Sequence, residues 1–156
     1  MASPFGKIWI LVFNLLLGRK RGEHHRKAGE RYRLENGAKP GVTTTASGLQ
    51  WEVLRAGTGP RPGFSGRVVV HYRGTLVNGV EFDSSYARGE PATFGLLDVI
   101  SGWREGLQLM PEGSHYRFVI PPDLAYGATG AGLLIASMST LIFEVELLRV
   151  ESKDKH

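Results

Sequence analysis

The chain of 156 residues contains no cysteine. This absence excludes disulfide bonds, thiolate nucleophiles and metal sites built on cysteine ligands. It does not decide the compartment, because reduced and secreted proteins alike can lack cysteine. The 21 glycines and the scattered prolines also argue against a mostly helical protein, since both residue types disfavour helix interiors.

Outside its N-terminal quarter the chain has little net charge. Residues 1–40 contain nine Lys/Arg and three Asp/Glu, a net of +6, whereas residues 41–156 contain ten against twelve, a net of −2. The basic character therefore belongs to the leading segment. A basic globular surface of the kind that binds nucleic acid is not supported, and no nucleic-acid partner is expected.

A long hydrophobic run is missing as well. The apolar stretch I-W-I-L-V-F-N-L-L-L occupies 8–17 and is followed by R-K-R at 19–21. Ten residues of helix cover about 15 Å, half of a hydrocarbon layer of about 30 Å. Three interpretations stay open: an interfacial anchor through which residues 1–21 contact a membrane surface, an uncleaved export signal, or a helix that packs on protein. If the stretch inserts, the basic cluster on its C-terminal side favours a cytoplasmic domain, with the periplasm as the alternative.

The composition divides the chain into four parts. Residues 1–22 form the apolar segment with its basic cluster, and residues 23–48 read as a polar helix that ends at Gly37 and continues into a linker. The folded domain is expected over 49–150, followed by a tail at 151–156.

Within the domain the hydrophobic period changes to two, which is typical of strands. Asn78-Gly79 is a strong hairpin signal, and only the segment near 101–109 reads as a helix. The pattern predicts an α+β fold in which an antiparallel sheet has one face covered by one short helix. Gly102 and Gly106 are then expected where the sheet approaches the helix closely, with Trp103 spanning the gap. The expected strands are 51–54, 67–77, 80–82, 115–120 and 140–150.

A search for reactive groups finds no nucleophile paired with a base. Ser84 and Ser85 lack the strand–turn–helix context of a nucleophile elbow, and His71 is interpreted as an ordinary strand residue. The loop G-A-T-G-A-G at 127–132 precedes a strand and has no Lys-Ser/Thr, so it is not a phosphate-binding loop. Neither a cofactor nor a metal ion is expected. The aromatic residues, several of which stand beside loops, instead suit a concave apolar pocket with a few polar groups at its rim.

Four stretches together resemble the FKBP-type peptidyl-prolyl cis-trans isomerases, and they cover essentially all of the domain. The lead-in A-G-E-R-Y-R-L-E-N-G is similar to the bacterial branch that includes the macrophage infectivity potentiator proteins, whose N-terminal dimerisation region is here shortened to the apolar stretch. The four stretches are V-V-V-H-Y-R-G-T-L-V-N-G-V-E-F-D-S-S (68–85), V-I-S-G-W-R-E-G-L-Q-L-M-P-E-G-S (99–114), I-P-P-D-L-A-Y-G (120–127) and S-T-L-I-F-E-V-E-L-L (139–148).

The resemblance implies a five-stranded antiparallel sheet wrapped around one short helix, and rotation of Xaa-Pro bonds in proline-containing peptides and unfolded proteins. Trp103 would be the pocket floor, Asp83 and Tyr126 would supply polar contacts, and Arg88 would brace the aspartate. The backbone N–H of Ile100 would be a further donor. The implied walls are Tyr72, Phe82, Phe94, Val99, Ile100, Ile135 and Phe143.

One stretch departs from the family pattern. The family usually has I-P-P after the glycine-rich loop, and here Ile135 is followed by Ala136 and Ser137. A freer loop predicts weaker binding of macrolide inhibitors and an altered substrate preference, with activity retained. The main alternative is a non-catalytic peptide-binding or chaperone module that uses the same groove.

Overall fold

The computed structural model describes residues 4–151, and the side chains from residue 20 onward. The side chains of the apolar stretch 8–17 and the tail after Glu151 lie outside the described residues. Among the described residues, no helix is both long enough and apolar enough to span a membrane.

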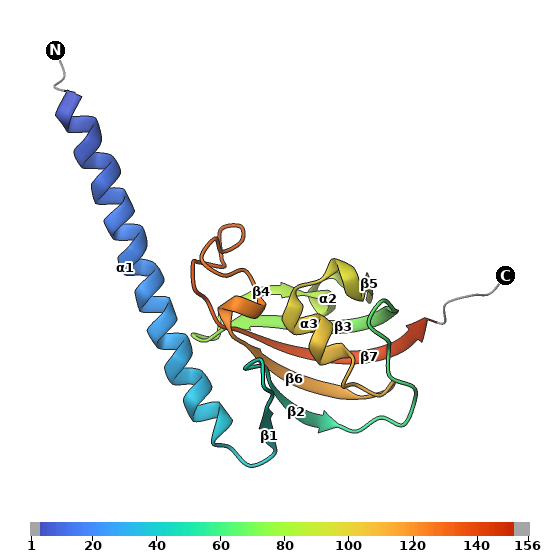
Figure 1. Cartoon of the computed structure of the whole chain (residues 1–156). Helices are drawn as coiled ribbons and strands as arrows, with labels where there is room; N and C mark the ends of the chain where they lie inside the picture. Colours follow the sequence, from blue (N-terminus) through green and yellow to red (C-terminus); the bar gives the residue numbers. More distant parts are fainter. Residues whose placement is uncertain (1–3, 152–156) are drawn as a thin grey trace.

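The chain begins with one long helix, α1 (Pro4–Gly37), which extends away from the rest of the molecule like an arm (Figure 1). It ends at Gly37, where the glycine signal places a helix end. From residue 20 onward its least exposed positions recur every three or four residues and include Gly22, Gly29 and Asn36. This spacing puts them on one face of the helix, which is the face turned to the domain.

An antiparallel sheet forms the body of the domain and confirms the predicted α+β class. Its strand order is β1-β2-β6-β7-β3-β4, and β5 pairs with β3 off this path. The long central strands β3 and β7 pair along their whole length. The strands are β1 (Val42–Thr44), β2 (Gln50–Arg55), β3 (Arg67–Leu76), β4 (Glu81–Ser84), β5 (Ala92–Gly95), β6 (His115–Ile120) and β7 (Leu141–Glu151).

The sheet has two short strands more than the five expected. Strand β1 falls in the segment interpreted as a linker, and it forms the edge of the sheet, where it pairs only with β2. Strand β5 follows Pro91 and pairs with the first half of β3. Both are three or four residues long, too short to show an alternating pattern.

Helix α3 (Ser101–Leu107) covers the concave face of the sheet (Figure 1) and closes the core. A Cβ atom on Gly102 would lie 2.5 Å from Cγ2 of Ile120, and one on Gly106 would lie 2.6 Å from Cε1 of Phe118. Neither position has room for a larger residue, so the interpretation of both glycines as close-approach positions is confirmed. The core around α3 includes the fully buried Leu107 and Met110.

Three short helical segments connect the strands around the open end of the sheet. They are α2 (Ser85–Arg88), η1 (Leu96–Asp98) and η2 (Pro122–Leu124). The predicted hairpin turn at Asn78-Gly79 joins β3 to β4, with Gly79 at a φ of 87°. Residues 125–140 form a long loop between η2 and β7, which Figure 1 shows on the side of the domain facing α1.

Candidate functional site

A pocket of about 640 Å³ opens between α3, the β3–β4 pair and the loop before β7. Every residue expected at the site lines it except Arg88. Three residues that the sequence did not single out for the site, Asp98, Ala131 and Gly132, line it too. The remaining lining residues are Tyr72, Phe82, Asp83, Phe94, Val99, Ile100, Trp103, Tyr126, Ile135 and Phe143.

Trp103 occupies the centre of the pocket floor, and three aromatic rings meet it edge-on. The ring centroids of Tyr72, Phe94 and Phe143 lie 5.1, 5.5 and 5.2 Å from that of the indole, with interplanar angles of 84–88°. The indole is only 5% exposed. Perpendicular contacts at these distances are favourable for aromatic pairs, and the floor is therefore held in one orientation before any ligand binds.

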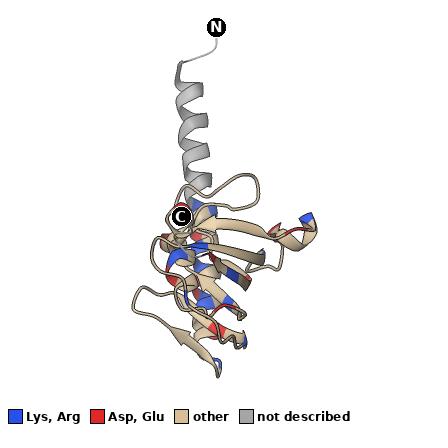
Figure 2. Cartoon of the chain, turned by 90° about the vertical axis from the view of Figure 1, so that its right-hand side faces the viewer, with Lys and Arg blue, Asp and Glu red and all other residues tan. Residues whose placement is uncertain are grey.

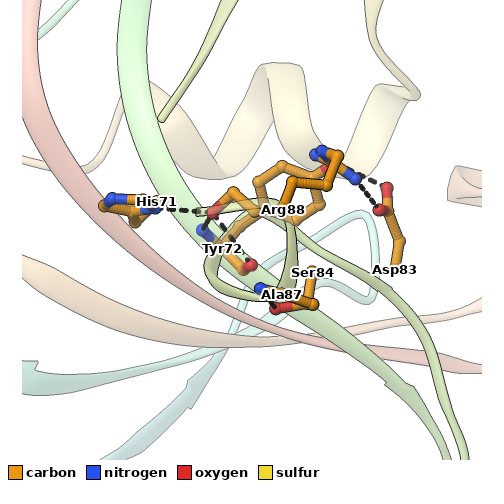
Figure 3. A network of polar contacts seen from close by, with 7 residues as sticks. His71, Tyr72, Asp83, Ser84, Ala87 and Arg88 are labelled. Carbon is orange, nitrogen blue, oxygen red and sulfur yellow. Dashed lines mark hydrogen bonds and ion pairs between the residues drawn. The ribbon is translucent and has the colours of Figure 1, made fainter. Parts of the chain in front are cut away.

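Polar groups gather at one side of the rim around Asp83 (Figure 3). The Tyr72 hydroxyl donates to Oδ2 of Asp83 across 2.5 Å, and Nη1 of Arg88 donates to Oδ1 across 2.5 Å. Nη2 of Arg88 also donates to the Tyr72 hydroxyl oxygen across 2.8 Å. The three side chains form a closed triangle, so Arg88 braces the aspartate from outside the pocket, as expected for this position.

The triangle also sets the ionisation of its members. Burial raises the pKa of Asp83, but the hydrogen bonds from Tyr72 and Arg88 outweigh it and hold the pKa of the carboxyl below its usual value. Burial and the bond to the carboxylate both raise the pKa of Tyr72. The rim therefore carries a carboxylate and a neutral phenol across the neutral pH range.

Two serines behind the rim hold this arrangement in place. The hydroxyl of Ser85, which is fully buried, accepts the backbone N–H of Tyr72 across 2.7 Å. Ser84 caps α2 by accepting the N–H of Ala87 across 3.2 Å (Figure 3). Sequence reasoning treats Ser84 and Ser85 only as candidate nucleophiles and misses this structural role.

The structure brings Ser85 close to His71, with 2.8 Å between Oγ and Nδ1. His71 stacks on the ring of Tyr86 and does not line the pocket. The serine hydroxyl is fully buried and already holds the Tyr72 backbone. This pair therefore has no access to a substrate and does not form a nucleophile–base pair.

The opposite side of the rim is built from loop residues and the start of α3. Tyr126 is 41% exposed, and Ile135 follows in the same loop. Among the described residues, no hydrogen bond involves the backbone N–H of Ile100, which precedes α3 at the mouth of the pocket. This N–H therefore has no backbone partner among the described residues, and its role as a donor to a ligand carbonyl stays a prediction.

The arrangement suits binding and distortion of a ligand better than bond cleavage. The lining is mainly aromatic and aliphatic, and of its two carboxyl groups, Asp83 and Asp98, the first already accepts hydrogen bonds from Tyr72 and Arg88. No lining residue of the described pocket is a serine, a histidine or a lysine. Around the domain, basic and acidic residues are interspersed on the face shown in Figure 2 and form no continuous basic surface there.

Two family models match the chain. The model of the FKBP-type peptidyl-prolyl cis-trans isomerases covers residues 59–148, and the domain amino-terminal to such isomerases covers residues 17–53. The chain is 52% identical over 132 residues to the FKBP-type isomerase FkpA of Aeromonas hydrophila, which is 85% of this chain and 49% of that protein. It is 45% identical to the outer membrane protein MIP of Legionella longbeachae, over 85% of this chain and 57% of that protein.

The crystal structure of FkpA from Escherichia coli has the same architecture, with a TM-score of 0.86 at 39% identity. The similarity covers 97% of this chain and 74% of that one. The chain thus spans about half the length of the two sequence relatives named above. Their names give no support to a cytoplasmic location, and one of them places that relative in the outer membrane. With more than half of its residues matched by the isomerase model, the chain belongs to the family of FKBP-type peptidyl-prolyl cis-trans isomerases.

Proposed function

We propose that this chain is a peptidyl-prolyl cis-trans isomerase that accelerates rotation about Xaa-Pro bonds and thereby assists protein folding. The observation that carries the proposal is the preformed aromatic pocket floored by Trp103 and flanked by the braced Asp83. A proline ring is compact and apolar, so it suits an apolar pocket that is already formed before the peptide binds.

The reaction requires no acid, base or nucleophile. Rotation about the peptide bond is opposed by about 18–20 kcal/mol, because the twisted state loses amide resonance. In that state the carbonyl is less polarised, and an apolar, water-poor pocket suits it better than water does. Binding the twisted form more tightly than either planar form lowers the barrier, and every 1.36 kcal/mol of this preference is about tenfold in rate.

Each part of the pocket has a proposed role. Trp103 supports the proline ring from below, and the N–H of Ile100 holds a substrate carbonyl at the mouth. Asp83 presents its carboxylate toward the twisting amide, while Arg88 positions it. The residues proposed to act on the rotating bond are Tyr72, Phe82, Asp83, Trp103, Tyr126 and Phe143, and those proposed to hold the peptide are Phe94, Val99, Ile100, Ile135 and Arg88.

The test is catalysis by the full chain on a short Xaa-Pro peptide, followed by NMR exchange between the cis and trans forms. We expect a rate far above the spontaneous one that collapses in Phe82→Ala, because Phe82 lines the pocket but is only partly buried. A folded wild-type chain that binds the peptide without accelerating exchange would instead favour the non-catalytic binding module. A chain that neither binds nor catalyses would contradict both.

Further partners and the location follow from the same proposal. The pocket is expected to admit macrolide inhibitors, whose ring carbonyls and apolar bodies resemble the twisted peptide. A periplasmic or membrane-associated position is supported by the relative named as an outer membrane protein, and the basic segment of residues 1–21 fits contact with a membrane surface. We also propose that the isomerase domain is the segment 49–150, preceded by the segments 1–22 and 23–48 and followed by the tail 151–156.

A further inference from the structure

The long helix α1 touches the domain at the loop that forms one wall of the pocket. A Cβ atom on Gly22 would lie 3.1 Å from Oγ of Ser137 and 3.9 Å from Cγ of Met138. Two turns later, a Cβ atom on Gly29 would lie 2.9 Å from Cβ of Thr140. The helix backbone therefore approaches the chain just before and just after Met138, at Ser137 and Thr140. It does so at two positions that carry no side chain.

The segment that α1 clamps, residues 137–140, is strained at Met138, and its one local side-chain hydrogen bond among the described residues runs from the Ser139 hydroxyl to the carbonyl of Ala136 across 2.8 Å. Met138 is the one described residue other than glycine with a positive φ, 62°, a left-handed conformation that is unfavourable for a residue with a side chain unless its surroundings enforce it. The chain from 123 to 151 contains no proline. Thr140 is 2% exposed, and among the described residues no group hydrogen-bonds to its hydroxyl. The buried face of α1 at Gly29 covers this hydroxyl.

The clamped segment leads directly into the pocket wall. The N–H of Met138 donates to the carbonyl of Gly127 across 2.9 Å, beside the pocket residue Tyr126. Ile135 lies two residues before Ser137 and is joined to Ala131 by a reciprocal pair of backbone hydrogen bonds of 2.8 and 3.1 Å. The backbone around Ser137 is thus connected to Ile135 through the chain and to Gly127, the neighbour of Tyr126, through the bond from Met138, and both Ile135 and Tyr126 line the pocket.

The C-terminal end of α1 is fixed independently of this loop. The amide of Asn36 donates to Oε1 of Gln50 across 2.8 Å, and the amide of Gln50 donates to the carbonyl of Arg33 across 2.7 Å. Arg117 of β6 reaches Asn36 across 3.5 Å and also bonds to the Tyr32 hydroxyl. The C-terminal turns of the helix are thus anchored on β2 and β6. This anchor fixes the position of the turns at Gly22 and Gly29 relative to the loop.

We propose that α1 is a positioning element for the pocket: the close approach at Gly22 and Gly29 sets the place of the 131–139 loop and thereby tunes which peptides the isomerase accepts. The inference rests on the proposed isomerase function. Gly22 and Gly29 act through Ser137 and Thr140 and touch no substrate. Each glycine lowers the stability of the helix relative to alanine, and the close contact explains why glycine stands at both positions.

The test uses the full chain with Gly22→Val and Gly29→Ala. Both substitutions favour the helix intrinsically, so a loss of function cannot come from helix propensity. We expect KM for Xaa-Pro peptides to change at least threefold, with kcat within about twofold, because the triangle of Tyr72, Asp83 and Arg88 is untouched. Gly63→Val is the matched control, since nothing lies within 4 Å of a Cβ atom at Gly63.

Two further measurements separate positioning from general damage. Ser137→Gly in the Gly22→Val background removes the side chain that the valine meets. We expect this second substitution to return KM most of the way to the wild-type value. Amide NMR signals of residues 131–138 should shift in both glycine variants and stay in place in the control. Unchanged KM and unshifted loop signals would overturn the proposal. A fall in kcat together with a changed KM, in variants whose unfolding midpoint is lowered, would also overturn it, because it would indicate general damage to the fold.

The amide signals also keep this inference separate from the proposed function. If the wild-type chain shows no catalysis, the isomerase proposal fails while loop shifts in the glycine variants still support positioning by α1. If the wild type is active and the loop signals do not respond to Gly22→Val, the isomerase proposal stands and the positioning role is wrong.

Discussion

The hydroxyl of Tyr72 donates a hydrogen bond to the carboxylate of Asp83 across 2.5 Å, from one strand to its antiparallel neighbour. The pairing of β3 with β4 places Asp83 opposite Gly74, two residues along β3 from Tyr72, and α2 returns the chain so that Arg88 reaches both side chains. The carboxylate is therefore held on two sides before a peptide arrives. Such preorganisation favours electrostatic stabilisation of a changing amide, because the site needs no reordering during the reaction.

Removing the charge at this position should lower activity without unfolding the domain. We expect Asp83→Asn to reduce kcat/KM about tenfold, which corresponds to about 1.4 kcal/mol and is close to the lower end of the range for a charge-assisted hydrogen bond. Glu81→Gln, two residues earlier on β4, is the matched control because its exposed pair with Arg73 lies outside the pocket. Equal activity of the two variants would exclude a role for the Asp83 charge.

Activity should not vary between about pH 5 and pH 9. The pKa of Asp83 is lowered in the folded chain, so its contribution to stability is complete above the unfolded value of about 4. That contribution is lost as the pH falls through the lowered folded value. The raised pKa of Tyr72 keeps the phenol neutral beyond pH 10. An inflection of kcat/KM near pH 6–7 would show instead that a histidine takes part.

Shortening the side chain of Phe143 in the pocket wall should lower both the stability of the fold and its activity. Phe143 is 5% exposed and meets Trp103 and Phe82 edge-on at 5.2 and 5.3 Å. We expect Phe143→Leu to destabilise the fold by about 1–2 kcal/mol and to lower kcat/KM more than tenfold, because the proline would meet a softer, wider pocket. Denaturant unfolding and peptide exchange on the same sample measure the two effects. Retained activity in the destabilised variant would remove Phe143 from the site.

The main strands could be predicted because their side chains alternate clearly between two environments. In β3, Val68, Val70 and Tyr72 are buried, and the residues between them are more exposed. The close approach of the sheet at Gly102 and Gly106 could also be predicted, because two glycines in one short helix weaken it unless a neighbouring element needs the space. Strand β5 could not be predicted, because its four residues are strand only through their pairing with β3.

The pocket residues were predicted through the family resemblance rather than through periodicity. Periodicity placed Tyr72 on the buried face but did not pair it with Asp83, which lies on another strand and needs the β3–β4 register to meet it. The continuity of α1 was missed for a related reason. Gly22 and Gly29 weaken a helix when only local propensity is counted, and their purpose becomes visible only against the loop they contact.

The basic cluster at 19–21 gives a prediction about membrane contact. We expect the full chain to pellet with vesicles rich in anionic lipid and to do so much less with neutral vesicles, because cations near the surface contribute about 1 kcal/mol each. The triple substitution Arg19→Gln, Lys20→Gln and Arg21→Gln should weaken pelleting by an order of magnitude or more. Substituting Arg55, Arg67 and Arg149, which are exposed on the domain, removes the same number of charges and controls for charge alone. Equal pelleting of all three proteins would contradict the anchor interpretation.

Restoring the family prolines should stiffen the loop over the pocket. Among the described residues, neither Ala136 nor Ser137 uses its N–H in a hydrogen bond, so proline at these positions breaks none. Each compatible proline stabilises a fold by about 0.4–1 kcal/mol through the unfolded chain. We expect Ala136→Pro with Ser137→Pro to raise the unfolding free energy by about 1–2 kcal/mol and to tighten macrolide binding several-fold, measured by calorimetry. The gain in affinity should come from Ile135 and Tyr126 being held in place, and an unchanged affinity in a stabilised chain would show that loop freedom does not limit binding.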